Sequence, residues 1–152
     1  MERISPREAL ALMERDGYAY LDVRTVPEFE TGHPTGAYNV PVALAGEGGM
    51  VPNARFADEV AAVFAKDAPL VVGCASGVRS LDAALQLEAA GFTRVVEQRA
   101  GMVGVRDPFG RVRERGWRDE GLPVATTAES ARAYREIAAR LEGGREGGGR
   151  DG

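Results

Sequence analysis

Short apolar runs alternate with helical segments along most of this chain. Residues 18–23, 69–73 and 93–98 read YAYLDV, PLVVG and TRVVEQ, and branched or aromatic side chains in short runs are typical of buried strands. Segments with helical periodicity lie between these runs, and the connections are short. This β-α-β-α-β order predicts a parallel sheet covered by helices on both faces. The predicted fold class is therefore α/β.

The first helix has clear end signals. Ser5 is expected to cap it, Pro6 to occupy its first position and Glu8 to complete a capping box. Gly17 is expected to end it, because glycine readily adopts the left-handed conformation found after helices. A helix is therefore predicted between Ser5 and Gly17.

Later segments carry weaker signals. The glycine-rich residues 45–50 (AGEGGM) predict a loop, after which Asn53 is expected to cap a helix. Residues 80–91 predict another helix, which ends at Gly91. A final helix is expected to start near Thr126 or Thr127.

The composition limits the classes of function. The chain has 152 residues, enough for one domain with a hydrophobic core. Its net charge of −4 argues against general nucleic-acid binding. One cysteine, Cys74, and one histidine, His33, exclude an internal disulfide and a conventional structural zinc site. We therefore expect no metal and no cofactor.

Membrane and targeting signals are also lacking in the sequence. The first residues, MERISPREAL, contain no apolar segment, and no run of about 18 apolar residues occurs. We therefore expect a cytoplasmic, reduced protein without a membrane partner.

The single cysteine follows a predicted buried strand, in the segment CASGVRS (74–80). A loop there lies at the carboxyl edge of the sheet, where open α/β folds bind ligands. Backbone N–H groups, the start of a helix near Ser80 and the charge of Arg79 all favour a thiolate at Cys74. Gly77 allows a tight turn.

A thiolate among N–H donors is suited to attack an anionic substrate. No histidine or carboxylate is near Cys74 in the sequence, so activation is expected from the loop itself. The alternative is that Cys74 is a small core hydrophobe, as free cysteines after buried strands usually are. The residues alone leave the reaction open.

Three motifs in order resemble the rhodanese (thiosulfate sulfurtransferase) family. CASGVRS resembles its active-site loop, LDVRTVPEFETGHPTGAYNVP its N-terminal signature, and GWRDEGLPV its closing segment. The resemblance covers about residues 4–125. It implies a rhodanese-like three-layer sandwich over residues 1–125, with a central parallel sheet flanked by helices. A C-terminal helix at 126–142 is expected to pack on this domain or extend it, and a disordered tail to follow at 143–152.

The resemblance also implies a reaction. Cys74 would take the outer sulfur of thiosulfate or a related donor and become a persulfide, and cyanide or a thiol would then remove that sulfur. The loop residues would bind the anionic donor; they are Ala75, Ser76, Gly77, Val78 and Arg79. The expected partners are thus a small-molecule sulfur donor and a cyanide or thiol acceptor.

Two alternatives remain open. Four residues lie between Cys74 and Arg79, whereas phosphatases that resemble this fold have five, so a phosphatase or arsenate reductase is the second candidate enzyme. A sulfur-carrier or interaction module, whose acceptor is a thiol-bearing carrier protein, is the other. Residues 102–116 form an insert relative to many family members and are rich in arginine. We expect this insert to close over the site, to recruit a carrier or to steer anions.

Other polar residues are interpreted as supporting ones. Asp22 and Arg24 at a strand end are expected to form an ion pair that fixes the loop, and Ser80 to support the site. His33 and Trp117 are interpreted as structural.

Overall fold

The computed structural model describes the backbone of residues 1–151 and the side chains of residues 1–143. At its centre is a five-stranded sheet with the strand order β1-β8-β7-β2-β4. The strands are β1 (Glu2–Ile4), β8 (Val95–Gln98), β7 (Leu70–Gly73), β2 (Ala19–Asp22) and β4 (Tyr38–Asn39). All neighbouring pairs are parallel, which confirms the predicted parallel sheet. The carboxyl ends of the strands therefore meet at one edge.

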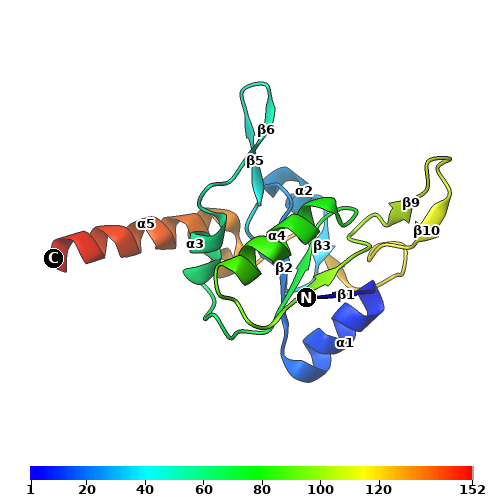
Figure 1. The fold of residues 1–152 in the computed structure, drawn as a ribbon, viewed down its shortest axis with the longest axis horizontal. Helices are drawn as coiled ribbons and strands as arrows, with labels where there is room; N and C mark the ends of the chain where they lie inside the picture. The colour runs from blue at the N-terminus through cyan, green and yellow to red at the C-terminus, as the bar shows by residue number, and fades with distance from the viewer. Residues whose placement is uncertain (152) are drawn as a thin grey trace.

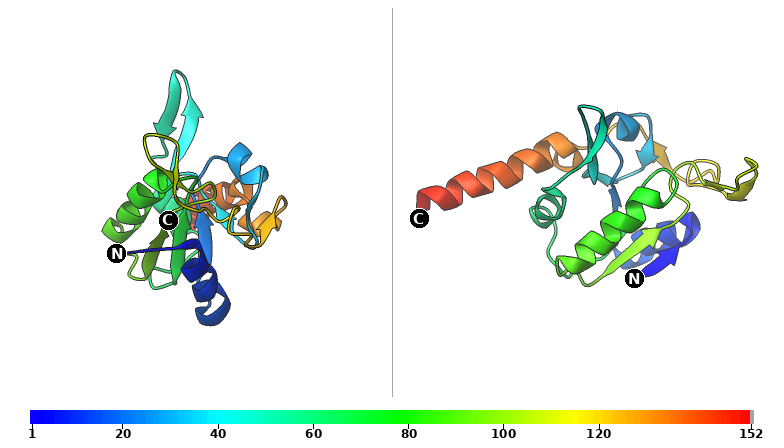
Figure 2. Two further views of the ribbon diagram at one scale, coloured as in Figure 1. Left: turned by 90° about the vertical axis from the view of Figure 1, so that its right-hand side faces the viewer. Right: turned by 45° about the horizontal axis from the view of Figure 1, so that its top comes forward.

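Helices cover both faces of the sheet and give it three layers (Figures 1 and 2). Helices α1 (Pro6–Asp16) and α2 (Val26–Glu30) lie on one face. Their side chains pack with Tyr20, Val71 and Val96. Helices α3 (Phe56–Ala61), α4 (Val78–Ala89) and α5 (Tyr134–Asp151) pack on the other face. Their core cluster includes Leu21, Val72 and Val95. Successive strand residues point to opposite faces, so the predicted α/β sandwich is confirmed.

Helix α1 has the predicted ends. The Ser5 Oγ accepts from the Glu8 N–H at 3.1 Å, and the Glu8 carboxylate accepts from the Ser5 N–H at 3.0 Å. Gly17 follows the helix with φ of 68°, in the left-handed region that favours glycine. The sequence did not predict β1, which precedes α1 and forms the sheet edge beside β8.

Two local predictions differ from the structure. Residues 45–50, predicted as a loop, belong to an antiparallel hairpin of β5 (Ala43–Gly46) and β6 (Gly49–Pro52). Glu47 and Gly48 make the turn, and Gly48 and Gly49 have positive φ. The prediction that Asn53 caps α3 is wrong, because the capping position is Arg55. Asn53 is instead buried, and its amide donates to the Pro41 carbonyl and to Glu59.

The C-terminal helix starts later than predicted. Residues from 124 on first form β11 (Val124–Ala125), paired with β3 (His33–Pro34), and then a 3-10 turn, η1 (Ser130–Arg132). Helix α5 begins only at Tyr134. Neither it nor another described helix is long and apolar enough to cross a membrane. The predicted division of the chain at residues 125 and 142 stays a prediction. The predicted disordered tail covers residues 143–152, and the side chains after residue 143 lie outside the described part of the structure.

His33 and Trp117 are buried structural residues, as predicted. The two ring nitrogens of His33 lie 2.7 Å from the Phe29 carbonyl oxygen and 3.1 Å from the Thr127 carbonyl oxygen. The Trp117 Nε1–H donates to the Pro123 carbonyl at 2.8 Å. The His33 contact links the segment after residue 116 to β3, and the Trp117 bond joins two parts of that segment.

Candidate active site around Cys74

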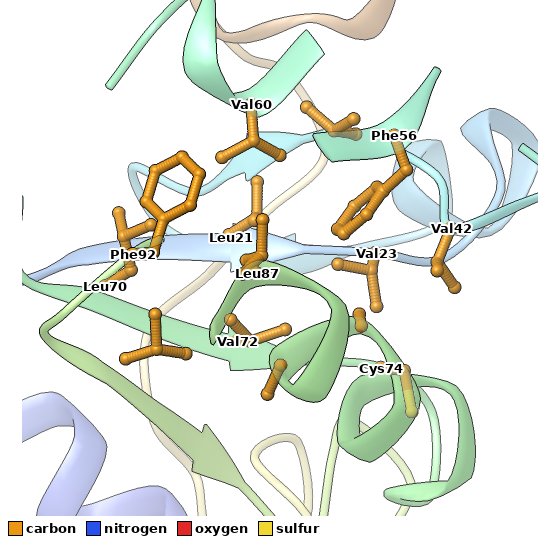
Figure 3. Close-up of a cluster of buried hydrophobic side chains, with 14 of the residues drawn as sticks. Leu21, Val23, Val42, Phe56, Val60, Leu70, Val72, Cys74, Leu87 and Phe92 are labelled. Carbon is orange, nitrogen blue, oxygen red and sulfur yellow. The ribbon is translucent and has the colours of Figure 1, made fainter. Parts of the chain in front are cut away.

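The cysteine loop connects the central strand β7 to α4 at the carboxyl edge of the sheet. Gly77 is the residue before α4 and has φ of 90°. A Cβ at Gly77 would lie 2.2 Å from the Arg99 carbonyl oxygen, so both the backbone conformation and the space require glycine. The close-up in Figure 3 places Cys74 at one end of the core cluster, beside the start of α4.

The thiol points into the loop that follows it. The Cys74 Sγ is 3.2 Å from the Gly77 nitrogen, 3.3 Å from the Ser80 nitrogen and 3.3 Å from the Ser80 Oγ. Cys74 is also 1% exposed and packs on the core cluster. It is therefore both a core residue and a sulfur atom held by N–H donors. Two backbone amides face the sulfur among the described residues: that of Gly77, just before α4, and that of Ser80, in the first turn of α4.

The chain after β8 supports the loop from the side. The Met102 N–H donates to the Cys74 carbonyl and the Val103 N–H to the Ala75 carbonyl, each at 2.9 Å. Gly101, with φ of 65°, lies so close that a Cβ there would be 2.3 Å from the Ala75 carbonyl oxygen. Residues 101–103 thus fix the backbone of the cysteine loop.

Arg79 is held by an acidic residue that sequence reasoning missed. Its guanidinium donates to both carboxylate oxygens of Glu28 in α2, at 2.6 and 2.9 Å. These bonds hold the pKa of the Glu28 carboxyl at about 2. The role predicted for Arg79 in donor binding stays a prediction. In this structure its charge is directed at Glu28, beside the loop.

Asp22 and Arg24 form the ion pair that the sequence suggested. Arg24 donates to both Asp22 carboxylate oxygens, at 2.8 to 3.2 Å, and to the Gly32 carbonyl at 2.7 Å. The side chains are 1% and 4% exposed. Asn39 adds bonds from its amide to the backbone carbonyls of both residues. The pair fixes the end of β2 next to β7 and is not open to solvent.

A second acidic residue, Glu97 at the end of β8, reaches the site from the other side. The Ser80 hydroxyl donates to one Glu97 oxygen at 2.5 Å, and the Arg3 Nε donates to the other at 2.6 Å. Ser80 and Glu97 are fully buried. A glutamate that directly follows two valines in the predicted strand TRVVEQ was the sequence signal for it. Ser80 thus contacts both Cys74 and Glu97, and its predicted supporting role stays a prediction.

The insert forms an arm beside the loop (Figure 1). It contains β9 (Val105–Arg106) and β10 (Val112–Glu114), an antiparallel pair. Two cavities of about 650 and 680 Å³ adjoin it, and Ser76, Val78 and Val105 line both. Cys74 lies in the wall of neither cavity, since it is buried beneath the exposed part of the loop. The insert therefore borders the approach to the loop.

Positive charge is concentrated on this arm. The arm has four exposed arginines, and a fifth follows it at position 118: Arg106, Arg111, Arg113, Arg115 and Arg118. The first cavity is lined by Arg3, Arg99 and Arg113; Arg99 is paired with Glu114. The surroundings of the loop are thus suited to an anion.

No group of three or more possible metal-binding side chains occurs among the residues described.

The fold and the site together define a class of protein. It is a parallel α/β sandwich with a buried thiol in the loop at the carboxyl edge of its sheet. The Rhodanese-like domain family matches residues 5–107, and the chain belongs to that family.

Two relatives and one solved structure agree with this membership. The chain is 46% identical over 108 residues to Senescence-associated protein DIN1 of Raphanus sativus, covering 71% of this chain and 52% of that protein. It is 41% identical over 108 residues to Thiosulfate sulfurtransferase 16, chloroplastic, of Arabidopsis thaliana, covering 71% and 80%. The crystal structure of Rv0390 from M. tuberculosis superposes with a TM-score of 0.68 at 27% identity, covering 84% and 98%. The chain spans about half the length of DIN1.

Proposed function

We propose that this protein is a sulfurtransferase that moves a sulfane sulfur from thiosulfate or a related donor to cyanide or a thiol through a persulfide on Cys74. The observation that carries the proposal is the thiol between the Gly77 and Ser80 N–H groups at the start of a helix. Such donors stabilise negative charge on sulfur. The family membership, and a relative that is named a thiosulfate sulfurtransferase, support the same reaction.

The reaction has two displacement steps. The Cys74 thiolate attacks the outer sulfur of thiosulfate, the sulfur–sulfur bond of the donor breaks, and sulfite leaves with the bonding electron pair. The acceptor then attacks the outer sulfur of the persulfide, and the Cys74 thiolate leaves. Each step exchanges one bond to sulfur for another, so neither a metal nor a redox cofactor is needed. Residues 75–79 are proposed to hold the anionic donor.

A thiol-bearing carrier protein is the second candidate acceptor. Exposed apolar side chains lie on the loop and the arm, where Val78 is 78% and Phe109 is 87% exposed. They are accompanied by the unpaired guanidinium groups of Arg111 and Arg113 within the described part of the chain. An acidic partner protein with an accessible thiol would complement this surface.

The cytoplasmic location expected from the sequence stays a prediction.

Turnover assays distinguish the candidates. We expect thiocyanate formation from thiosulfate and cyanide with the native protein and none with Cys74→Ser. Slow transfer to cyanide but fast transfer to a protein thiol would favour the carrier role. Hydrolysis of an aryl phosphate without any sulfur transfer would contradict the proposal and favour the phosphatase alternative.

A further inference from the structure

Glu97 is a buried carboxylate at the catalytic edge of the sheet. It is 0% exposed and lies near the end of β8. In the parallel pairing of β8 with β1, Glu97 is opposite Arg3. The Arg3 Nε donates to its Oε1 at 2.6 Å, and the Arg3 side chain is 44% exposed. A buried carboxylate is retained in a fold only when charged or hydrogen-bonding groups compensate it. Arg3 compensates one oxygen of Glu97, and the other oxygen faces the thiol loop.

Ser80 links that second oxygen to the thiol. Its hydroxyl lies 2.5 Å from Glu97 Oε2 and 3.3 Å from Cys74 Sγ. All three side chains are at most 1% exposed. A continuous hydrogen-bonded chain therefore runs from the sulfur through one hydroxyl to a carboxylate, without solvent between them.

Counting protons gives two arrangements of this hydrogen-bonded chain that fit the contacts. A serine hydroxyl has a single proton, and an ionised carboxylate can only accept. If Ser80 donates its proton to Glu97, the Ser80 oxygen can only accept from Cys74, so the sulfur must carry a proton. In this first arrangement the thiol is neutral and the glutamate is ionised.

The same contacts permit the opposite arrangement. The Cys74 proton passes to the Ser80 oxygen, and the Ser80 proton passes to Glu97 Oε2. Glu97 then donates to Ser80, and Ser80 donates to the thiolate. No proton is gained or lost, and the site keeps one negative charge in both states. The exchange therefore forms the thiolate without adding a second negative charge. This matters because two adjacent negative charges disfavour each other.

We propose that Glu97 accepts the Cys74 proton through Ser80 and so acts as a positioning residue for the nucleophile. The proposal deepens the sulfurtransferase function and rests on it for its biological role. It replaces the expectation that the loop alone activates the thiol. Arg3 orients Glu97 and also reaches the loop, where its Nη2 lies 3.5 Å from the Gly77 carbonyl oxygen.

Other charged groups near the thiol are engaged elsewhere. Both oxygens of Glu28 accept from Arg79, and both oxygens of Asp22 accept from Arg24. Arg79 and Tyr20 interact electrostatically with Cys74. The Tyr20 hydroxyl accepts from Gln98, and burial raises the pKa of Tyr20. Among these neighbours, only Glu97 presents an oxygen to a hydroxyl that reaches the sulfur.

The test is the rate of Cys74 alkylation by iodoacetamide as a function of pH, followed by intact mass in the full chain. No sulfur donor is present, so the proton relay is tested independently of sulfur transfer. With Glu97 as proton acceptor, the native rate should stay nearly flat from about pH 6 to about pH 8. In Glu97→Gln the internal proton acceptor is gone, so the rate should rise with pH over the same range and lie below the native rate at about pH 6.

Three further variants make the result specific. Glu97→Asp should restore part of the flat profile, and Ser80→Ala should behave like Glu97→Gln. Glu120→Gln, an identical change in a surface pair with Arg7, should leave the profile unchanged. A folded Glu97→Gln protein with the native profile would overturn the proposal. If Glu97→Gln does not fold, a native profile in Ser80→Ala would overturn it. A normal alkylation profile without persulfide formation would contradict the sulfurtransferase function instead.

Discussion

Arg79 and Glu28 connect the cysteine loop to helix α2 by two hydrogen bonds. The motif CASGVRS was enough to predict that Arg79 lies beside the cysteine loop, because loop and helix start are adjacent in sequence. Its partner was not predictable in the same way. Glu28 is 51 residues away, and its local signal is a capping box with Thr25. Glu97 escaped prediction for the same reason, since only the pairing of β7 with β8 brings it to Ser80.

The Glu28 carboxyl should titrate far below its ordinary range. Its pKa is lowered from 4.5 to about 2, chiefly by the hydrogen bonds from Arg79. The stabilisation it gives is therefore fully present above about pH 4.5 and is lost as the pH falls toward about 2; solvent screening reduces its size because Glu28 is partly exposed. Carboxyl NMR titration should show the low midpoint, and Arg79→Ala should raise it. A native midpoint near 4.5 would contradict the ion pair.

Gly77→Ala should disable the site more than the fold. The new Cβ would meet the Arg99 carbonyl oxygen and displace the loop. A displacement of this kind can reduce rates by about 10²-fold, and we expect such a loss in persulfide formation. Gly91→Ala is the matched control, because Gly91 has φ of 99° with no atom within 4 Å of the added Cβ. Equal effects of both changes on the rate would refute the proposed role of the close contact.

At the scale of elements, local sequence patterns predicted the central strands better than the edge strand β1 and the start of the C-terminal helix α5. Strands β2, β7 and β8 were predictable because each contains a short run of apolar or aromatic residues. Strand β1 was not, because three residues, ERI, carry no periodicity. The start of α5 was misplaced because residues 124–127 are held by distant partners, β3 and the His33 ring. Helix propensity alone does not reveal such contacts.

Helix α5 should contribute to the stability of the whole domain. Ile137 is 0% exposed and belongs to the core cluster with α3 and β2. Ile137→Ala should lower the free energy of unfolding by about 2–5 kcal/mol, through lost burial and the cavity that remains. Leu141→Ala, on the same helix at a half-exposed position, should lower it by much less. Chemical denaturation measures both, and equal effects would show that α5 is not anchored through Ile137.

At the scale of the whole molecule, charge is unevenly distributed. The chain has a net charge of −4, yet the arm beside the cysteine loop carries exposed arginines, and α5 extends from the opposite side (Figure 1). A local positive field of this kind increases the encounter rate with anions, and salt screens it. The arm could be recognised in the sequence as an arginine-rich insert, but its position beside Ser76 and Val78 required the structure.

Removing two arm charges should weaken steering of the donor. The double variant Arg111→Gln, Arg113→Gln should lower kcat/KM for thiosulfate by about twofold to fivefold at low salt and flatten its salt dependence. Arg135→Gln with Arg140→Gln on α5 is the control of equal charge and should change neither. A native kcat/KM that is independent of ionic strength would exclude steering by the arm.

The most direct measurement is the intact mass of the reduced protein after brief exposure to thiosulfate, with Cys74→Ser in parallel. Since Cys74 is the only cysteine, a persulfide can form at one position. The account predicts a gain of one sulfur atom that is absent in the variant and is released by cyanide. No gain with thiosulfate, mercaptopyruvate or polysulfide would contradict sulfur transfer through Cys74.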